Sequence, residues 1–230
     1  MTTVLVTGAN RGIGLEFVRQ YAAEGAQVIA CCRRPDAATE LGQVAQASDG
    51  RVRILPLDVA ETDSIDTLKA ILDDEPIDIL INNAGISGPR EQSAKRIDPE
   101  GWLETFRVNT IAPVLVAQAL HDNLKRGGDK KLVAITSQLG STANNGGGLY
   151  AYRSTKAALN NAMRGLARDW AGDGITVAIL HPGWVQTDMG GRSAPVTPQA
   201  SVKGLRQRIA ELAPGSSGAY RDFAGAELSW

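Results

Sequence analysis

A tyrosine and a lysine stand four residues apart in the stretch YAYRSTKAALNNAM, residues 150–163. On a helix this spacing places Tyr152 and Lys156 one above the other on the same face. A tyrosine hydroxyl ordinarily has a pKa of about 10, and a neighbouring ammonium lowers that pKa because it stabilises the phenolate. The pair therefore predicts proton transfer near neutral pH. The same spacing is common on helices that do no chemistry, so other parts of the chain must support this prediction.

A glycine-rich turn, TGANRGIG at residues 7–14, directly follows a short apolar run. Gly8 permits a sharp turn, Gly12 leaves room for a pyrophosphate near the backbone, and Gly14 lets the next helix lie close to a sheet. Free N–H groups at the start of that helix favour an anion. The spacing G-x-x-x-G-x-G differs from the general dinucleotide fingerprint G-x-G-x-x-G, and glycine turns also serve packing. The position between a strand and a helix, more than the pattern, predicts a dinucleotide-binding site.

Arginines follow the second predicted strand, where such sites carry their specificity for the adenosine ribose. An acidic residue at that position binds the ribose hydroxyls, whereas an arginine accommodates a 2′-phosphate. Here the residues are Arg33 and Arg34, and Arg11 in the glycine-rich turn adds a further cation. Asp36 is the nearby acid, and Pro35 is expected to direct it away from the strand end. We therefore favour NADP(H) over NAD(H) as the cofactor. NAD(H) is the alternative if these arginines are only surface charges.

Short apolar runs alternate with segments of helical periodicity along the whole chain. Six runs are predicted strands, at residues 3–8, 26–32, 51–57, 77–83, 131–137 and 175–182. Five segments are predicted helices, at residues 12–24, 62–74, 99–126, 150–171 and about 197–212. The strand runs are continuously apolar, which is typical of a parallel sheet buried on both faces. We predict an α/β protein with a single Rossmann-fold domain over residues 1–230. Its doubly wound parallel sheet has about seven strands with helices on both faces, and a substrate loop and helix lie at about 184–212.

Composition and charge argue against several classes of partner. The chain has 230 residues, a formal net charge of −1, 43% hydrophobic residues and 21% charged residues. This balance provides no long-range attraction to nucleic acid or to an anionic membrane, and no apolar run reaches the roughly 18 residues of a membrane span. Cys31 and Cys32 are adjacent, so on a strand they point to opposite faces and predict neither a disulfide nor a metal site. The start carries no secretion signal. We expect a cytoplasmic protein with no metal, nucleic-acid or membrane partner.

Six motifs follow one another along the chain: TGANRGIG (7–14), NNAG (82–85), VNT (108–110), ITS (135–137), YRSTK (152–156) and HPGWVQTDM (181–189). In this order, from residue 3 to about residue 190, they resemble the short-chain dehydrogenase/reductase family in its compact single-domain form. The final stretch, YRDFAGAELSW (220–230), resembles the carbonyl-reductase-like branch that contains the bacterial C-factor and insect sniffer proteins. The resemblance implies hydride transfer between a nicotinamide and a small carbonyl or alcohol substrate. The protein then supplies placement and a proton.

The resemblance implies a role for each of four residues. Tyr152 would protonate the substrate carbonyl oxygen, or deprotonate an alcohol in the reverse direction. Lys156 would hold the hydroxyls of the nicotinamide ribose and lower the pKa of Tyr152. Ser137 would hydrogen-bond the substrate oxygen, with Ser141 as the alternative because the gap before Tyr152 is longer than usual for the family. Asn109 would hold a water that links Lys156 to solvent.

The resemblance also implies which residues bind the cofactor. Asp58 would accept a hydrogen bond from the adenine amino group, with helix capping as the alternative role. Val185 and Thr187 would contact the nicotinamide carboxamide beyond a turn shaped by Pro182 and Gly183. The full predicted set is Gly8, Asn10, Arg11, Gly12, Ile13, Gly14, Arg33, Asp58, Val59, Asn83, Ala84, Gly85, Tyr152, Lys156, Pro182, Gly183, Val185 and Thr187.

The resulting functional hypothesis is NADPH-dependent reduction of a ketone, an aldehyde or a quinone, with Tyr152 as the proton donor. Two alternatives stay open: a dinucleotide-binding sensor of the C-factor type with little catalysis, and an NAD-linked alcohol dehydrogenase. The long predicted helices at 99–126 and 150–171 form subunit contacts in many proteins of this family, so a homodimer is one expectation. Four residues belong either to an apolar substrate cavity or to packing: Leu139, Leu149, Trp184 and Met189.

Overall fold

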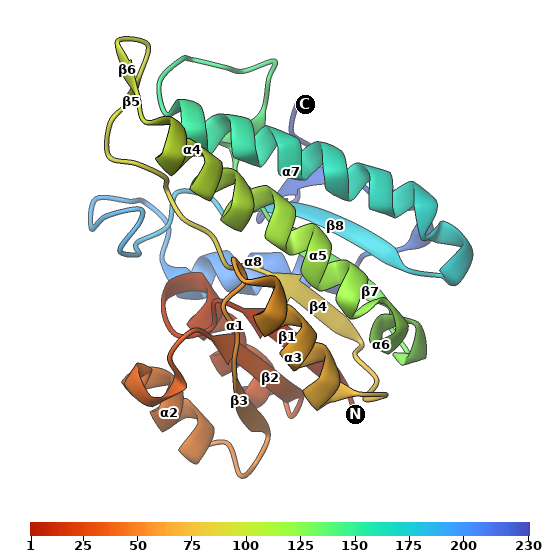
Figure 1. The fold of residues 1–230 in the computed structure, drawn as a ribbon. Helices are drawn as coiled ribbons and strands as arrows, with labels where there is room; N and C mark the ends of the chain where they lie inside the picture. Colours follow the sequence, from red (N-terminus) through yellow and green to blue (C-terminus); the bar gives the residue numbers. More distant parts are fainter.

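A computed structural model describes all residues from 1 to 230. Its centre is a sheet of seven strands (Figure 1). Neighbouring strands are parallel, in the order β3-β2-β1-β4-β7-β8-β9. The strands are β1 (Thr3–Thr7), β2 (Gln27–Cys32), β3 (Val52–Pro56), β4 (Ile79–Asn82), β7 (Lys131–Ile135), β8 (Thr176–His181) and β9 (Tyr220–Asp222). With helices on both faces of this sheet, the predicted fold class is confirmed.

The strand order reverses between β1 and β4. The chain first builds outward from β1 through β2 and β3, and then crosses to β4 on the other side of β1. Ligands of such sheets bind beyond the carboxyl ends of the strands at this switch point. In β1, Leu5 is paired with Ile29 on one side and with Leu80 on the other. The glycine-rich turn after β1 therefore lies beside the segment that follows β4.

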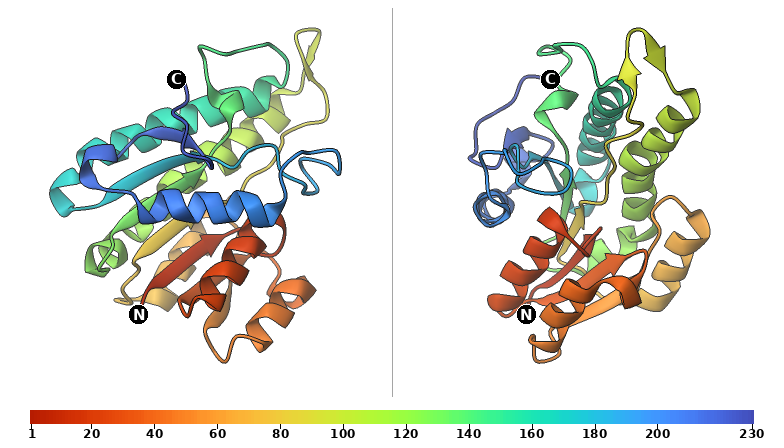
Figure 2. Two further views of the ribbon diagram at one scale, coloured as in Figure 1. Left: turned by 180° about the vertical axis from the view of Figure 1, so that it is seen from behind. Right: turned by 90° about the vertical axis from the view of Figure 1, so that its left-hand side faces the viewer.

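Helices cover both faces of the sheet (Figures 1 and 2). One face carries α1 (Gly12–Ala23), α2 (Thr39–Gln46) and α8 (Pro198–Ala210), and α1 and α8 pack against each other. The opposite face carries α3 (Thr62–Leu72), α4 (Pro99–Phe106), α5 (Ala112–Ala119), α6 (His121–Arg126) and α7 (Tyr150–Asp169). The helix that contains Tyr152 and Lys156 thus lies across the sheet from the helix that follows the glycine-rich turn.

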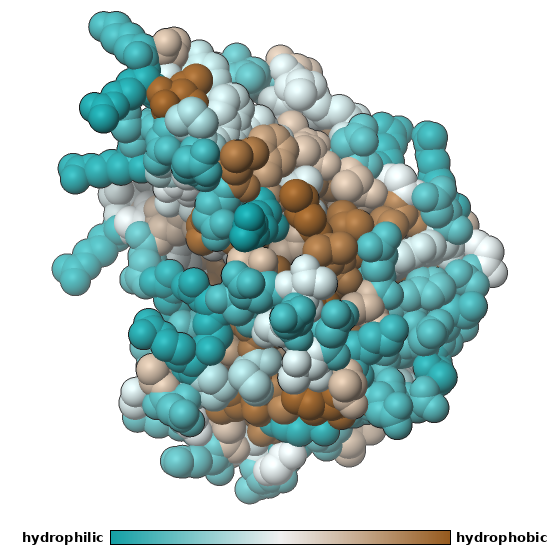
Figure 3. Space-filling view, viewed as in Figure 1, coloured by the Kyte–Doolittle hydropathy of each residue, from teal (hydrophilic) through white to brown (hydrophobic).

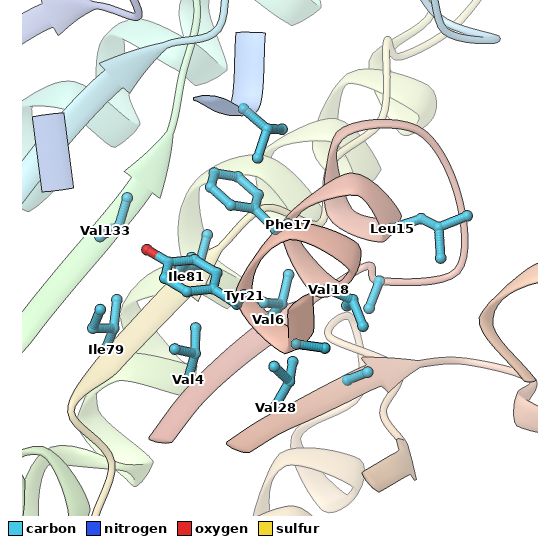
Figure 4. Close-up of a cluster of buried hydrophobic side chains, with 14 of the residues drawn as sticks. Val4, Val6, Leu15, Phe17, Val18, Tyr21, Val28, Ile79, Ile81 and Val133 are labelled. Carbon is cyan, nitrogen blue, oxygen red and sulfur yellow. The ribbon is translucent and has the colours of Figure 1, made fainter. Parts of the chain in front are cut away.

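Each face of the sheet has its own hydrophobic core, because successive residues of a strand point in opposite directions. Val4 of β1 packs with Phe17 of α1 in one core (Figure 4), and Leu5 points into the other. Cys31 and Cys32 separate in the same way, and both are free thiols. The prediction that the two cysteines point to opposite faces is therefore confirmed.

The predicted single helix over 99–126 is wrong, because the structure divides this stretch. A five-residue π-helical segment, Arg107–Ile111, separates α4 from α5, and α6 begins at His121. Pro113 has no N–H to donate to the carbonyl of Asn109 four residues earlier, so the regular α-helical pattern fails there. The irregular segment holds Asn109 fully buried, on the inner side of the helix.

Four other elements were not predicted from the sequence. They are α2, the hairpin of β5 (Gln92–Ser93) and β6 (Arg96–Ile97), and the edge strand β9. β9 has only three residues, and β5 and β6 have two each. Elements this short do not extend over enough residues to show a periodicity, so only their contacts with the rest of the fold define them.

The surface over α4 and α5 is partly apolar (Figure 3). Leu103 and Ile111 are exposed there, which agrees with a subunit contact at the predicted place, although the homodimer itself stays a prediction. None of the helices has both the length and the apolar character that crossing a membrane requires.

Candidate active site

The glycine-rich turn is locked against the segment that follows β4. Gly8 has a φ of +66°, which glycine adopts without strain, and a Cβ there would lie 2.9 Å from the Cα of Ala84. Asn83 Nδ2 donates to the carbonyl oxygens of Thr7 (2.9 Å) and Gly8 (3.2 Å). The Thr7 hydroxyl accepts from the backbone N–H groups of Asn83 (3.0 Å) and Ala84 (3.1 Å). Direct backbone contact therefore shapes the turn.

The start of α1 fits the pyrophosphate of a dinucleotide. Arg11, the N-cap residue, makes no side-chain cap, and the first turn contains no acidic residue. The first N–H groups of a helix have no intrahelical partner and carry partial positive charge, so an anion is favoured there. Gly14 packs so closely that a Cβ would collide with the Gly8 carbonyl oxygen. Gly12 and Ile13 lie between these positions, and the neighbouring Asn10 is exposed.

The three arginines near this turn differ in their partners. Arg33 and Arg34 follow directly after β2, are exposed, and take part in no ion pair. Arg11 Nη1 instead donates to Asp188 Oδ2 at 2.7 Å, with 69% of the arginine and 74% of the aspartate side chain exposed. Asp36 lies in the short 3₁₀ turn Pro35–Ala37 beyond the strand end. Two cations are thus free to meet a phosphate beside β2, and a third is held by a carboxylate.

α7 brings Tyr152 and Lys156 to the same side, as their spacing predicts. Lys156 Nζ lies 5.9 Å from the centre of the Tyr152 ring. The lysine is buried, and Nζ donates to the carbonyl oxygen of Ile135 at 3.0 Å, at the end of β7. A Cβ on Gly85 would lie 3.7 Å from the same Nζ. Lys156 therefore reaches from α7 to the carboxyl ends of both β7 and β4.

Burial dominates the ionisation of both side chains. Burial raises the pKa of Tyr152 above its ordinary value of 10.0, and a hydrogen bond with the Ser137 side chain opposes that rise. Burial also lowers the pKa of Lys156 from 10.5 to about 8. The pKa of Tyr152 is thus raised overall, because the interior disfavours the charged form of each group. That Lys156 by itself lowers this pKa stays a prediction. Tyr152 is a neutral phenol at neutral pH.

The two candidate serines have different contacts. Ser137 is buried directly before the 3₁₀ turn Gln138–Gly140, and its side chain lies near Tyr152, whose pKa it lowers. Ser141 is also buried, but its hydroxyl donates to the carbonyl oxygen of Trp230 at 3.4 Å. The geometry therefore favours Ser137 over Ser141 as the serine that acts with Tyr152.

Asn109 joins the segment after β4 to α7. Its Oδ1 accepts from the N–H of Ile86 at 2.8 Å, and its Nδ2 donates to the carbonyl oxygen of Ile86 at 2.8 Å. Nδ2 also donates to the Thr155 hydroxyl at 3.2 Å, and that hydroxyl donates to the carbonyl oxygen of Tyr152 at 2.9 Å. The side-chain amide of Asn109 therefore already has partners on both sides, and Thr155, to which the sequence analysis assigns no role, links Asn109 to the first turn of α7.

Asp58 closes the turn between β3 and α3. Its Oδ1 accepts from the N–H of Ala60 at 3.1 Å. The N-cap of α3 is Glu61, which makes no side-chain cap, so helix capping by Asp58 is wrong. Val59 packs at the edge of the adjacent core. The second carboxylate oxygen of Asp58 has no partner within the chain, which leaves it available as an acceptor.

The segment after β8 folds over the glycine-rich turn. Gly183, next to Pro182, has a φ of +85° and turns the chain. Val185 is buried. A Cβ on Gly12 would lie 3.2 Å from the Thr187 methyl carbon, which places Thr187 directly above the start of α1. The predicted nicotinamide-binding and pyrophosphate-binding segments are therefore in contact.

Three of the four apolar residues on the substrate side are exposed. Trp184 and Met189 are each 54% exposed and Leu149 is 46% exposed, whereas Leu139 is half-buried. Packing does not account for the three exposed side chains. They are available to an apolar substrate.

Gln92 is a further residue that the sequence reasoning missed. The N-cap of α7 is Leu149, which has left-handed backbone (φ +47°) and no side-chain cap. Gln92 Oε1 accepts instead from the N–H of Tyr152 at 3.0 Å, and its Nε2 donates to the carbonyl oxygens of Ser87 and Pro89 at 2.7 Å each. Capping residues are normally adjacent to the helix start. Gln92 lies 60 positions away, so no local signal could have indicated it.

A dinucleotide-dependent oxidoreductase is the class of protein that this fold and site define. Sheets of this topology bind dinucleotides at the switch point, and here the half-buried phenol of Tyr152 lies beside Lys156, which reaches the same edge of the sheet. The chain belongs to the short-chain dehydrogenase family, because it matches the model of that family, described as short chain dehydrogenase, over residues 2–196. This confirms the resemblance carried by the six motifs.

Similarity to individual proteins shows to which branch of the family the chain belongs. It is 42% identical to the C-signal of Myxococcus xanthus over 156 residues, which are 67% of this chain and 93% of that protein. Its structure is similar to that of carbonyl reductase Sniffer of D. melanogaster, with 33% identity, a TM-score of 0.91 and full coverage of both chains. It is also similar to an NADPH-bound carbonyl reductase from chicken fatty liver, with 34% identity and a TM-score of 0.93, over 100% of this chain and 99% of that one. The predicted carbonyl-reductase-like branch is confirmed.

Proposed function

We propose that the protein reduces a ketone, an aldehyde or a quinone with NADPH as the hydride source. The observation that carries this proposal is the grouping of Tyr152, Lys156 and Ser137 at the carboxyl edge of the sheet. Tyr152 carries its proton at neutral pH, as a tyrosine with an ordinary pKa of about 10 does, and can donate that proton to a substrate carbonyl oxygen. The bound nicotinamide supplies the hydride, and the chain supplies the proton and the placement.

Tyr152 and Ser137 act together on the substrate carbonyl oxygen in this proposal. The Ser137 Oγ accepts from the N–H of Leu139 at 3.1 Å. That bond does not use the hydrogen of Ser137, which can be donated to Tyr152 in the free protein and to the substrate oxygen, on which negative charge develops during reduction, when a substrate is bound. Tyr152 then transfers its proton to that oxygen. Placement of both groups before the substrate arrives reduces the reorganisation that the reaction requires.

Lys156 and Asn109 would support the cofactor and the proton supply. With a pKa of about 8, Lys156 is mostly protonated at pH 7 and can donate to ribose hydroxyls. The side-chain amide of Asn109 is already bonded to Ile86 and Thr155. We therefore assign the water-holding role to its backbone carbonyl, which lacks the N–H that a residue other than Pro113 would donate.

The preference for NADP(H) rests on the exposed cations at the end of β2. Arg33 and Arg34 are unpaired and match a 2′-phosphate in charge and in hydrogen-bonding groups. Arg11 would join them once it leaves Asp188. The similarity to a carbonyl reductase with bound NADPH points in the same direction. NAD-linked alcohol oxidation is the alternative. It requires a ribose-binding acid that this strand end does not carry.

A panel of carbonyl compounds tests the proposal directly. The purified protein should oxidise NADPH in the presence of at least one ketone, aldehyde or quinone. Tyr152→Phe should lower kcat by about a thousandfold while NADPH still binds, because the substitution removes only the hydroxyl. Undiminished turnover in that variant would remove Tyr152 from the mechanism.

A dinucleotide sensor with little catalysis is a second candidate, favoured by the identity with the C-signal. Tight NADPH binding with no turnover across the panel would support it. Turnover that is lost in Tyr152→Phe would argue against it. In either case we keep the cytoplasm as the proposed location, where the unpaired Cys31 and Cys32 would stay reduced, and a homodimer as the proposed assembly.

A further inference from the structure

The carbonyl oxygen of Ser137 has two donors. The N–H of Gly140 donates to it at 2.9 Å and closes the 3₁₀ turn. The hydroxyl of Tyr220 donates to it at 2.5 Å, from a residue 83 positions away in β9. The first bond sets the shape of the turn that carries Ser137. The second ties that turn to the edge strand of the sheet.

Tyr220 is itself held in place on several sides. It is buried, and its backbone is in register with Ile179 of β8. Its ring lies 5.5 Å from the ring of Trp230, centre to centre. The Arg164 guanidinium of α7 lies 4.3 Å from the centre of that Trp230 ring. The phenol is therefore fixed between the sheet and the segment that ends at Trp230.

The hydroxyl of Tyr220 keeps its hydrogen at every working pH. Burial raises the pKa of Tyr220 to about 12, the nearby Tyr152 phenol adds to that rise, and the Asn160 side chain opposes it. A group in this state is a permanent donor.

Three successive residues at the end of β7 are anchored by side chains. Lys156 holds the carbonyl of Ile135 at 3.0 Å, and the Thr136 hydroxyl donates to Asn160 Oδ1 at 2.5 Å. Both of these anchors come from α7. The third anchor, from Tyr220 to Ser137, comes from β9, and it is the one that reaches the residue whose hydroxyl faces Tyr152.

We propose that Tyr220 is a positioning residue for Ser137: its hydroxyl holds the serine backbone where the serine side chain meets both Tyr152 and the substrate oxygen. This role rests on the proposed carbonyl reduction. Tyr220 does not touch the substrate or the cofactor. It acts by holding the turn at residues 137–140 in one position relative to the sheet edge.

Tyr220→Phe is the direct test, because it removes the hydroxyl and keeps the ring that packs on Trp230. We expect kcat and kcat/KM to fall together by about tenfold, since a small displacement of a group that acts in the transition state lowers the rate without weakening ground-state binding. The Kd for NADPH should not change. Tyr21→Phe is the matched control, because Tyr21 is also a buried tyrosine with a pKa raised by burial to about 12, but it lies on α1 in the other core. That control should leave kcat unchanged.

A double substitution separates positioning from a general structural role. If Tyr220 acts through Ser137, then Tyr220→Phe should cause no further loss of kcat in a Ser137→Ala background, measured at high enzyme concentration. A tenfold loss of kcat from Tyr220→Phe in both the wild-type and the Ser137→Ala background overturns the proposal. So does an unchanged kcat in the single variant Tyr220→Phe.

Hydrogen exchange provides a readout that needs no turnover. The N–H of Leu139, which donates to Ser137 Oγ, should exchange faster in Tyr220→Phe than in the wild type, and no faster in Tyr21→Phe. Equal exchange in the wild type and in Tyr220→Phe overturns the proposal. If the wild type reduces no carbonyl compound, the proposed function fails, and the exchange rates still decide whether Tyr220 positions Ser137.

Discussion

The carboxyl edge of the sheet holds two regions of opposite character. Around the glycine-rich turn the charged side chains lie in solvent: Arg33 is unpaired, and most of the Arg11–Asp188 ion pair is exposed. Around β7 and α7 the polar side chains are buried and have protein partners, as with Lys156 on the carbonyl of Ile135. The first region resembles a surface that can exchange one partner for another. The second is assembled in advance.

This difference corresponds to what each region must do. A site that takes up and releases a charged cofactor needs cations that can leave their partners, and exposed ion pairs are weak enough to allow this. A proton-transfer site needs groups that are fixed before the substrate arrives, which burial and hydrogen bonds provide. Substitutions in the first region should therefore change cofactor affinity, and substitutions in the second should change the rate or the pH dependence. The following predictions test this division.

The largest effect on stability is expected at Gly14. The glycine-rich turn is as tightly packed there as the region around β7 and α7. A Cβ on Gly14 would collide with the Gly8 carbonyl oxygen and lie 2.6 Å from Asn83 Nδ2. Gly14→Ala should lower the free energy of unfolding by about 3 kcal/mol, because backbone atoms cannot move aside cheaply. Denaturant unfolding measures this. In the control Gly165→Ala, in α7, the new Cβ meets nothing within 4 Å, and a gain of about 0.5–1 kcal/mol is expected. Equal stability of Gly14→Ala and the wild type would contradict the packing of the turn.

Lys156→Met should reveal the cost of burying an ammonium in the catalytic region. The pKa of Lys156 is lowered from 10.5 to about 8, so the folded state carries a desolvation penalty below pH 8 that disappears as the pH rises towards 10.5. Relative to Lys156→Met, the wild type should therefore gain roughly 2–3 kcal/mol in its free energy of unfolding between pH 7 and pH 10. The exposed Lys69, replaced in the same way, should show no such gain. A pH-independent difference for Lys156→Met would mean that Lys156 carries no such penalty.

Arg33→Ala should change the preference for NADPH over NADH and should leave the rate of the reaction nearly unchanged. Loss of one charge-assisted contact to the 2′-phosphate should lower the ratio of NADPH to NADH affinity by about tenfold. The kcat at saturating NADPH should stay within twofold of the wild type. Fluorescence titration measures both affinities. Arg168→Ala, an exposed arginine in the last turn of α7, is the control and should leave the ratio unchanged. An unchanged ratio of NADPH to NADH affinity in Arg33→Ala would show that this arginine does not bind the 2′-phosphate.

Asp188→Asn should have the smallest effect on cofactor affinity. It should raise the affinity for NADPH, whereas Arg33→Ala should lower it. The substitution removes the carboxylate that pairs with Arg11 and so releases a cation for the 2′-phosphate. NADPH affinity should rise by about threefold, in line with the weak coupling of exposed ion pairs, and NADH affinity should not change. Equal gains for both cofactors would show that the pair affects the closure of the segment after β8 and not the phosphate site.

Much of the fold could be predicted because its signals are local. Each of the six predicted strand runs contains the observed strand, and no run has more than two extra residues at either end. The split of Cys31 and Cys32 follows from the alternation of a strand alone. Likewise, the four-residue step of a helix placed Lys156 over the ring of Tyr152. Each of these features depends on residues that are close together in the chain.

The differences from the sequence-based expectations concern burial and an irregular helical segment. The spacing of Tyr152 and Lys156 predicts a lowered pKa for Tyr152, but burial raises that pKa overall, and burial is a property of the whole fold. The helix over 99–126 was predicted without a break because its apolar pattern continues through the irregular segment, where Pro113 leaves the carbonyl of Asn109 without its usual donor.

Local spacing and periodicity were enough to predict the fold class, the glycine-rich turn and the shared face of Tyr152 and Lys156, because these features involve residues only a few positions apart. How these two side chains ionise, and which groups hold them in place, depends on the assembled fold. Gln92 reaches the N–H of Tyr152 across 60 positions, Tyr220 reaches Ser137 across 83, and Arg11 reaches Asp188 across 177. Contacts at such separations leave no pattern in the chain, because they exist only once the sheet has brought its carboxyl ends together.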